Sequence, residues 1–244
     1  LAGAGTGKTR AITHRIAYLV QVRGISPWSI LAITFTNKAA NEMKSRVADL
    51  IGPVSLNMWV GTFHSMFARI LRRHAELIGY SSSYTILDTT DQRSLAKACC
   101  KELDLDSRQY NPNAIHSAIS DAKNRLKTPG QYEAEAGHDV FRKAVARVYR
   151  LYQRKLRQND AMDFDDILMY TVQLLHEQPE VLRQYQERFQ YIMVDEYQDT
   201  NGAQYEIIRL LAAGHHNICV VGDDDQSIYS FRGANIENIL NFEK

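Results

Sequence analysis

Two short segments near opposite ends of the chain carry residues suited to binding a nucleoside triphosphate. The first is LAGAGTGKT, at residues 1–9. Its alternating glycines allow a tight loop in which successive amide N–H groups turn toward phosphate oxygens. Lys8 would place a cation on the β- and γ-phosphates, and the Thr9 hydroxyl would be a ligand for Mg²⁺. A chance glycine-rich turn is the alternative, because Ala2 stands where GxxxxGK[ST] has its first glycine.

The helix expected to begin at Thr9 would direct its positive dipole end at the same phosphates. The residues predicted to contact the nucleotide are Ala2, Gly3, Ala4, Gly5, Thr6, Gly7, Lys8, Thr9 and Arg10.

The second segment is YIMVDEYQDT, at residues 191–200. Its apolar start suits a buried parallel strand that delivers Asp195 and Glu196 to the carboxyl edge of a sheet, where α/β folds bind ligands. Asp195 would hold Mg²⁺, and Glu196 would polarise the water that attacks the γ-phosphate. Another apolar run, 217–221, leads to Gln226, whose amide would bond the γ-phosphate or that water. Alone, the two acids would favour an ordinary helix cap after a strand; together with the glycine loop, they predict a triphosphate site.

The predicted roles in this site divide into two sets. The catalytic residues are Lys8, Asp195, Glu196 and Gln226, and the metal ligands are Thr9 and Asp195.

The distance in sequence between Lys8 and Asp195 exceeds what a compact P-loop core needs, which predicts an insertion. Strands are expected at 30–34 and 58–61, and helices at 37–51 and 64–78. From about 90 to 185 the pattern is almost wholly helical, with helix starts near 88–92 and a long helix over 139–158. Strand–helix alternation resumes at 189. We therefore predict an α/β fold, a parallel-sheet P-loop core of residues 1–80 and 185–244 interrupted by an α-helical insertion of residues 81–184.

Composition bounds the class of protein without naming it. The 244 residues are 45% hydrophobic and 23% charged, which is ordinary globular usage. A formal net charge of +1 says little about nucleic acid, because a protein that grips DNA in one channel need not be basic overall. The three cysteines form no CxxC pair, so buried or incidental thiols are expected. No run has membrane-spanning length and no signal peptide is evident, so a cytoplasmic location without membrane contact is expected.

Six segments in a fixed order carry a family resemblance. They are LAGAGTGKTR, AITFTNKAANEM, WVGTFHS, MDFDDIL, VDEYQDTN and VVGDDDQSIYSFRGA. Together they resemble the consecutive motifs of superfamily 1 DNA helicases of the UvrD/Rep/PcrA type, from the first residue to about residue 238. The resemblance implies a RecA-like first motor domain that uses ATP and Mg²⁺ to move 3′ to 5′ on single-stranded DNA and to separate duplexes at single-strand/duplex junctions.

Two further interpretations remain open. The helicase portion of an ATP-dependent nuclease shares these motifs, and a nucleotide-gated DNA-binding module without useful hydrolysis would also fit this chain. The pathway (repair, replication or recombination) and the choice between monomer and dimer are likewise open.

The ends of the sequence carry a further expectation. Leu1 stands where the last residue of the strand before the loop should lie. The resemblance implies that this strand, an adenine-recognising glutamine and a second motor domain with its arginines lie outside the chain. We therefore expect a fragment that binds ATP better than it hydrolyses it, since Arg10 is not placed to substitute for those arginines.

The resemblance also implies contacts with single-stranded DNA. The residues concerned are Phe35, Thr36, Asn37, Lys38, Thr62, Phe63, His64, Phe164, Tyr229, Phe231 and Arg232. Aromatic rings there would stack on bases, while hydroxyl, amide and cationic groups would bind phosphates. A capped helix start with a core phenylalanine is the alternative at 35–38 and 62–64. Relatives usually carry tryptophan at the Phe231 position, so base stacking there would be weaker.

Two features have a structural alternative of equal or greater weight. The segment 142–157 contains seven basic residues and no acid, which suits either a phosphate contact or a solvated basic face. Asp165 and Asp166 follow Phe164 and are typical of first-turn helix acids, and we expect this capping role for them.

Overall fold

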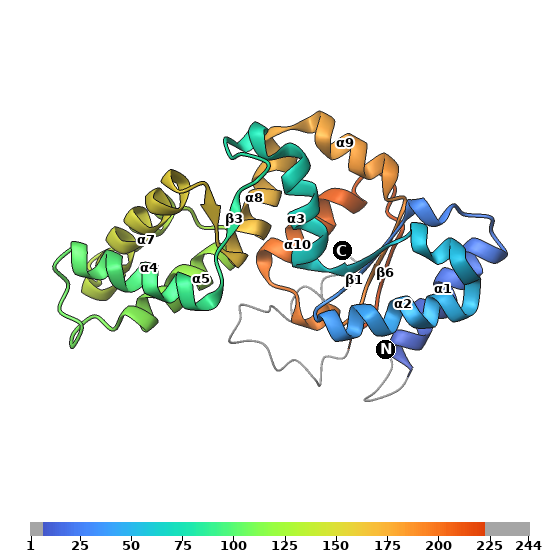
Figure 1. Cartoon of the computed structure of the whole chain (residues 1–244), viewed down its shortest axis with the longest axis horizontal. Helices are drawn as coiled ribbons and strands as arrows, with labels where there is room; N and C mark the ends of the chain where they lie inside the picture. Colours follow the sequence, from blue (N-terminus) through green and yellow to red (C-terminus); the bar gives the residue numbers. More distant parts are fainter. Residues whose placement is uncertain (1–6, 223–244) are drawn as a thin grey trace. The chain divides into compact units, whose positions relative to one another are not determined.

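A four-stranded parallel sheet forms the centre of the first part of the molecule. The computed structural model describes residues 7–222, and Figure 1 draws that part as ribbon. The strands are β1 (Ile30–Thr34), β2 (Trp59–Thr62), β5 (Tyr191–Val194) and β6 (Ile218–Val220), in the order β2-β1-β5-β6. In register, Ile33 lies opposite both Gly61 and Val194. Because helices cover both faces, the strands are almost continuously apolar, as in other parallel sheets.

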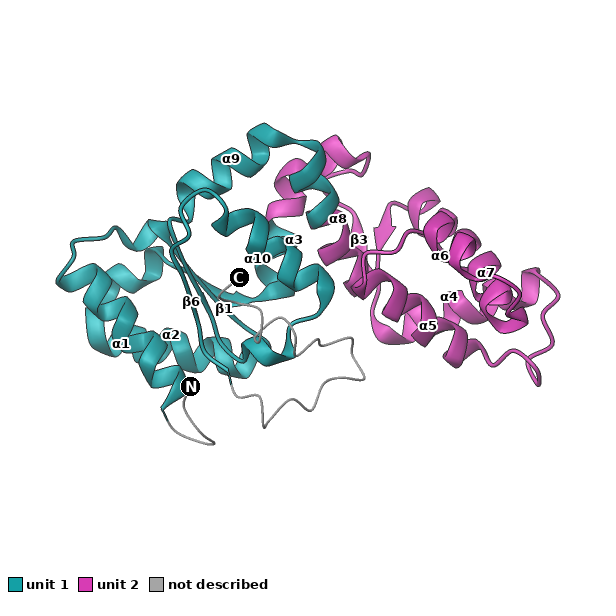
Figure 2. Ribbon diagram, turned by 180° about the vertical axis from the view of Figure 1, so that it is seen from behind, with its two compact units in different colours: residues 1–69, 172–244 teal, residues 70–171 magenta. Residues whose placement is uncertain are grey.

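Helices pack on the two faces of this sheet (Figures 1 and 2). One face carries α1 (Lys8–Gln21) and α2 (Asn37–Ile51), and the other carries α3 (Phe63–His74), α9 (Pro179–Arg188) and α10 (Gly202–Ala212). The core between α1, α2 and the strands includes Ile12, Ile16 and Met43, each fully buried. Short 3₁₀ turns complete the connections: η1 (Pro27–Ser29), η2 (Gly52–Asn57), η3 (Ala75–Ile78) and η4 (Tyr197–Asp199).

Local capping explains where α2 and α10 begin. The Thr36 hydroxyl accepts a hydrogen bond from the Ala39 amide at 3.1 Å and so caps α2, which ends at Gly52 with a φ of 73°. At α10, Asn201 and Gln204 satisfy each other's backbone amides in a reciprocal capping box. These caps place the strand-to-helix turns at fixed points on the sheet edge.

The second compact unit, residues 70–171, is almost entirely helical (magenta in Figure 2). Its helices are α4 (Thr89–Glu102), α5 (Pro112–Asn124), α6 (Pro129–Glu135), α7 (Val140–Gln158) and the first part of α8 (Phe164–Glu177). A two-stranded parallel ribbon, β3 (Thr85–Ile86) with β4 (Ala161–Met162), joins them. Tyr149 and Tyr152 of α7 are fully buried against α4 and α5, and their separation by three residues places them on one face of the helix.

The α/β fold class with a parallel sheet is confirmed. The first unit comprises residues 1–69 and 172–244, so the chain leaves it within α3 and re-enters it within α8. The core-and-insertion division with boundaries at 80 and 185 stays a prediction. The helix expected over 64–78 ends earlier, at His74, because the chain continues as η3 to Gly79, whose φ is 73°. Among the described residues, no helix combines the length and apolarity that crossing a bilayer would require.

Candidate nucleotide site and nucleic-acid edge

The parallel strands bring segments that are distant in sequence to one edge of the sheet. Their carboxyl ends are followed by residues predicted to bind nucleotide or DNA: Phe35 after β1, Phe63 after β2, and Asp195 after β5. Backbone bonds tie these ends together, since the Asp195 amide donates to the Ile33 carbonyl at 3.0 Å. The Tyr197 amide likewise donates to the Val221 carbonyl at 2.9 Å. The edge is therefore a hydrogen-bonded unit rather than a set of independent loops.

Thr9 and Asp195 meet at this edge. Gly7 caps α1, so Lys8 and Thr9 are the first residues of the helix. The Thr9 hydroxyl donates to Asp195 Oδ2 at 3.1 Å. Asp195 is buried, and this burial is the main reason why its pKa is raised. The negative charge of the neighbouring Glu196 carboxylate raises the pKa further. Lys8 is buried as well and lies near enough to lower the pKa of Asp195 by its charge. The two sequence halves of the predicted site thus come together.

Glu196 has an unusual backbone that directs its side chain. Its φ of 49° and ψ of 45° lie in the left-handed region, where residues other than glycine are uncommon. Its amide donates to Asp195 Oδ1 at 2.9 Å, which supports this conformation. The buried Gln198 donates from Nε2 to Glu196 Oε2 at 2.6 Å. Gln198 is thus a site residue beyond those predicted from the sequence; its position within the YIMVDEYQDT segment is the only signal for it.

Asp199 is a third carboxylate beside this pair. Its Oδ1 is buried and has no hydrogen-bond partner among the described residues. Burial, followed by the charge of Glu196, raises the pKa of Asp199 to about 6, while Lys8 opposes the shift. Among the described residues, the carboxylates Asp195, Glu196 and Asp199 interact electrostatically with one another and with the cation of Lys8. Divalent metal and phosphate chemistry uses such an arrangement.

Several predicted site residues lie outside the described residues. They are Ala2, Gly3, Ala4, Gly5 and Thr6 of the loop, and Gln226, Tyr229, Phe231 and Arg232 near the far end. Arg10 is described and exposed, and its Nε donates to His14 on the same helix at 3.3 Å. Its side chain therefore contacts its own helix.

The two predicted DNA-binding turns share an aromatic contact. The rings of Phe35 and Phe63 lie 5.4 Å apart at an angle of 59°. Phe63 is only 1% exposed and also contacts Phe67, so its ring belongs to the core. Phe35 is half-buried. Phe63 therefore fits the structural alternative, a core phenylalanine that supports Phe35, and Phe35 is the ring with an accessible surface.

Some polar residues of the same two turns make local hydrogen bonds, and others are exposed to solvent. Thr36 caps α2, and Asn37 and Lys38 are exposed beside it. Thr62 is buried and exchanges hydrogen bonds with Ser65, with its hydroxyl accepting from the Ser65 amide at 3.2 Å. His64 is half-buried at the start of α3. Contact with DNA at these positions stays a prediction.

The acids around Phe164 do more than the sequence analysis predicts. Phe164 is 43% exposed as the first residue of α8. Asp166 is in the first turn and accepts from the Asp163 amide at 3.1 Å, so capping contributes, as expected. Both Asp165 and Asp166, however, also reach across to α5. Sequence spacing does not predict that part of their role, because the partners lie about 40 residues away in sequence.

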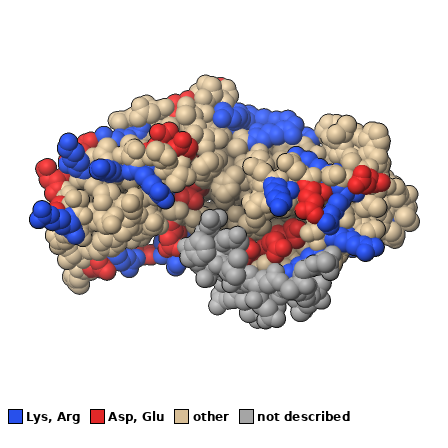
Figure 3. Space-filling view, turned by 60° about the horizontal axis from the view of Figure 1, so that its bottom comes forward, with Lys and Arg blue, Asp and Glu red and all other residues tan. Residues whose placement is uncertain are grey.

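The basic segment of α7 largely pairs within its own unit. Arg150 pairs with Glu133, Lys155 with Glu102, and Arg142 lies 3.9 Å from Glu135. Arg157 lies over the Tyr80 ring. On the face of the molecule that Figure 3 shows, basic and acidic side chains are interspersed. These contacts favour the solvated, internally paired alternative over a phosphate-binding stripe.

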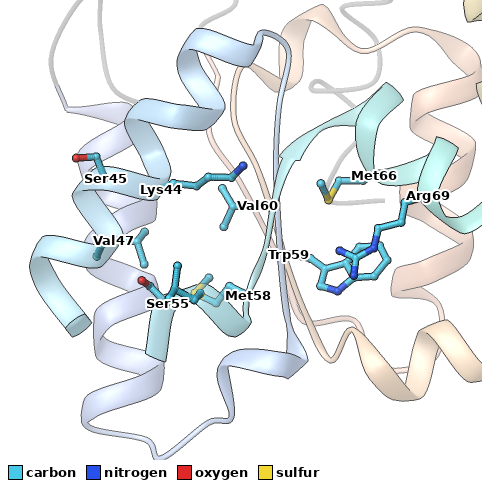
Figure 4. Close-up of a pocket in the computed structure, with 11 residues that line it drawn as sticks. Lys44, Ser45, Val47, Ser55, Met58, Trp59, Val60, Met66 and Arg69 are labelled. Atoms are coloured by element: carbon cyan, nitrogen blue, oxygen red, sulfur yellow. The ribbon is translucent and has the colours of Figure 1, made fainter. Parts of the chain in front are cut away.

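A cavity of about 500 Å³ lies between α2, η2, β2 and α3 (Figure 4). Lys44 and Arg69 contribute cations to its lining, and Arg69 stacks on the buried Trp59 ring at 4.2 Å. Met58 and Trp59 place it at the amino end of β2, opposite the edge that carries Asp195. The cavity is therefore separate from the candidate nucleotide site.

A parallel α/β sheet with the P-loop lysine at the start of a helix, opposite a strand-end carboxylate, defines a P-loop protein of the RecA-like type. The family model described as the UvrD/REP helicase N-terminal domain matches residues 1–244, and the chain belongs to this family. It is 55% identical over its full length to the ATP-dependent DNA helicase PcrA of Staphylococcus aureus (strain NCTC 8325 / PS 47). It is 54% identical to the PcrA helicase of Staphylococcus epidermidis (strain ATCC 12228 / FDA PCI 1200).

The chain covers only part of these relatives. Both matches span all 244 residues of the chain but 33% of the relative. The family resemblance and the RecA-like core predicted from the sequence are confirmed.

Proposed function

We propose that this chain is the ATP-binding motor portion of a DNA helicase, which couples ATP hydrolysis to movement along single-stranded DNA. The observation that carries the proposal is the hydrogen bond between Thr9 and Asp195, at 3.1 Å, in a member of the UvrD/REP family. Relatives that match the whole chain are named ATP-dependent DNA helicases, which supports ATP as the nucleotide and DNA as the partner. The 3′ to 5′ direction, and action at single-strand/duplex junctions, belong to this proposal.

The residues present fit a Mg²⁺–ATP complex. Magnesium prefers oxygen ligands and is commonly held by one or two carboxylates together with substrate phosphates. The Thr9 hydroxyl and the buried Asp195 carboxylate supply that donor set, and Lys8 supplies a cation for the β- and γ-phosphates. When bound, the metal would neutralise charge on the phosphates. Burial of Asp195 excludes water from its carboxylate and strengthens its electrostatic interactions.

Glu196 is proposed to orient the attacking water and accept its proton. A group of this kind must be held in a defined position, because general-base catalysis depends on geometry before pKa. The left-handed backbone at Glu196 and the 2.6 Å bond from Gln198 together hold the carboxylate. The backbone conformation sets the direction in which the side chain leaves the chain, and the bond from Gln198 restricts its rotation.

The DNA-binding part of the proposal uses the same sheet edge. Phe35 follows β1, and the Asp195 amide is bonded to the carbonyl of Ile33 two residues earlier on that strand. A change at the nucleotide site would therefore act on a strand end that also bears an aromatic ring with accessible surface. In the second unit, Phe164 offers an exposed ring for a base. The proposal also includes coupling through the segment from Gln226 to Arg232, because the predicted γ-phosphate contact and the predicted base platform lie on the same short stretch of sequence.

ATP hydrolysis with and without a single-stranded oligonucleotide tests the proposed function. The matched control is Glu196→Gln, which keeps the shape of the side chain and removes its capacity to accept a proton. We expect a DNA-stimulated rate, even a low one, that this variant lowers by roughly 10²–10⁴-fold while ATP binding persists. ATP binding with hydrolysis that neither DNA nor Glu196→Gln changes would contradict an ATP-driven motor and favour a nucleotide-gated DNA-binding module.

A further inference from the structure

A buried ion cluster lies beneath the start of α8. The Lys123 side chain, on α5, is fully buried, and its Nζ lies 2.7 Å from Asp163 Oδ2 and 2.8 Å from Asp166 Oδ1. Both carboxylates are buried as well. A lysine without solvent exposure is rare in proteins unless it is paired, and here it meets two acids from one helix start.

The rest of the cluster gives these acids further partners. Asp163 and Asp166 cap each other's amides, at 2.8 Å and 3.1 Å. From α7, the Tyr152 hydroxyl donates to Asp163 Oδ2 at 3.0 Å and Gln153 Nε2 donates to Asp166 Oδ1 at 2.8 Å. The start of α8 is therefore attached to α5 through Lys123 and to α7 through two polar side chains.

Asp165 is fixed in the same way from a second point on α5. It accepts from Ser120 Oγ at 2.6 Å and from Asn124 Nδ2 at 3.2 Å. Three of the four residues 163–166 are thus bound to neighbouring helices by their side chains. Phe164, the remaining one, is 43% exposed.

A helix cap alone does not require this arrangement. One Asp or Ser at the N-cap is enough to start a helix, and Asp163 already fills that role. Removing a lysine and two carboxylates from water is costly, and buried ion pairs of this kind seldom add net stability. Their best-attested use is to select one geometry among several, which here is the rotation and register of the turn that bears Phe164.

We propose that Lys123 is a positioning residue for nucleic-acid binding: with Asp163 and Asp166 it fixes the first turn of α8, so that the Phe164 ring is held ready to stack on an unpaired base. This inference rests on the proposed function, because it requires that Phe164 contacts single-stranded DNA. The inference adds a residue, Lys123, that does not itself contact the DNA. Lys123 acts entirely through the orientation of the ring.

A double-mutant cycle between Lys123 and Phe164 tests this, with the 244-residue chain and a labelled oligodeoxythymidylate followed by fluorescence anisotropy. Phe164→Ala should weaken binding roughly five- to 150-fold, the range for loss of one stacked base. Lys123→Met should weaken binding by a similar or smaller factor in the parent. In the Phe164→Ala background it should change binding by no more than about twofold, because its effect passes through the ring.

Lys127→Met is the matched control, since Lys127 is a lysine of the same unit that pairs with Glu135 at the surface. It should leave oligonucleotide binding unchanged. Lys123→Met leaves two buried acids without their cation, so its folding is checked by circular dichroism and thermal unfolding. If it does not fold, Ser120→Ala, which releases only Asp165, replaces it in the cycle and should give a smaller loss with the same dependence on Phe164.

The possible failures are distinguishable. If Phe164→Ala leaves binding unchanged, the proposed base contact is wrong, and the inference falls with it. If Phe164→Ala weakens binding while folded Lys123→Met and Ser120→Ala do not, the base contact stands and the positioning role is wrong. If Lys123→Met weakens binding equally with and without Phe164, the lysine acts through general structure, which also overturns the inference.

Discussion

Thr9 and Asp195 are 186 positions apart in sequence, yet the hydroxyl of one donates to the carboxylate of the other at 3.1 Å. This bond joins the helix that follows the glycine-rich loop to the end of the strand that carries the paired acids. Between them the chain forms a complete helical unit, residues 70–171, before it returns to the sheet. The contact therefore depends on parallel pairing of β1 with β5 rather than on local sequence.

Gln198 provides the first prediction. The Gln198 side-chain amide donates to the Glu196 carboxylate at 2.6 Å, so Gln198→Ala should release that carboxylate. We expect the maximal rate of ATP hydrolysis to fall about tenfold or more, with ATP affinity little changed, because orientation of a base affects kcat rather than binding.

Steady-state kinetics with and without single-stranded DNA measures this prediction, and Gln178→Ala, a half-buried glutamine before α9, is the matched control. An unchanged kcat in Gln198→Ala would show that the left-handed backbone at Glu196 suffices to hold the carboxylate.

The aromatic pair on the sheet edge provides the second prediction. Phe63 is 1% exposed, so Phe63→Ala should lower the free energy of unfolding by about 3–5 kcal/mol. Phe35 is half-buried, so Phe35→Ala should cost less stability and instead weaken binding of single-stranded DNA. Chemical denaturation and oligonucleotide titration of both variants distinguish the two roles. If both variants lose the same amount of stability and neither changes DNA binding, both rings have a structural role only.

The cap of α2 provides the third prediction. The Thr36 hydroxyl accepts from the Ala39 amide, so Thr36→Ala should reduce the free energy of unfolding by roughly 0.5–2 kcal/mol. Thr36→Ser keeps the acceptor and should restore most of that stability. Urea denaturation of the three proteins measures the difference. If Thr36→Ser is as unstable as Thr36→Ala, the methyl group rather than the hydroxyl supports the helix.

The ion cluster provides a pH prediction. Burial is the main reason why the pKa of Asp166 is raised to about 7, and the nearby Asp163 carboxylate adds to this effect, while the charge of Lys123 opposes it. Tyr152 and Tyr170 also face the cluster. Because this pKa lies above the unfolded value, the folded protein holds the proton more tightly. The stabilisation from Asp166 is thus complete in acid and is lost as pH rises through about 7.

Asp166→Asn should remove this component. Between pH 5 and pH 7, a range that lies between the unfolded and folded pKa values of Asp166, the Tm of the parent should fall more steeply than that of the variant, by an amount worth at most about 1.4 kcal/mol per pH unit. The pKa of Asp163 is held below its ordinary value by Lys123, so that group does not titrate in this window. Parallel Tm profiles for the two proteins would mean that Asp166 is ionised throughout.

The sequence predicts much of the fold because the patterns concerned are local. The limits of α2 follow from Thr36 and the glycine at 52, and the burial of Tyr149 and Tyr152 follows from helical spacing. The meeting of Thr9 with Asp195 is predictable because each belongs to a motif with a known partner motif. These parts required no knowledge of distant packing.

Other parts of the site depend on tertiary contacts that no spacing reveals. Lys123 lies on an amphipathic helix, where a lysine is ordinarily solvated, and its partner Asp163 is 40 residues away. In the sequence, the only indication of a buried cation is the group of acids on either side of Phe164. Similarly, the bond from Gln198 to Glu196 exists because the backbone turns left-handed at Glu196, a conformation that side-chain type does not predict. Residues outside 7–222, among them Gln226, stay predictions.

The measurement that tests the central claim most directly is the Mg²⁺ dependence of ATP binding, by calorimetry, in the parent, Thr9→Ala, Asp195→Asn and the double variant, with Glu196→Gln as control. If Thr9 and Asp195 form one metal site, the parent and Glu196→Gln should bind ATP more tightly with Mg²⁺ than without. Each single change should remove most of that enhancement, and the double variant should lose little more. A full Mg²⁺ enhancement that persists in Asp195→Asn would contradict the proposed site.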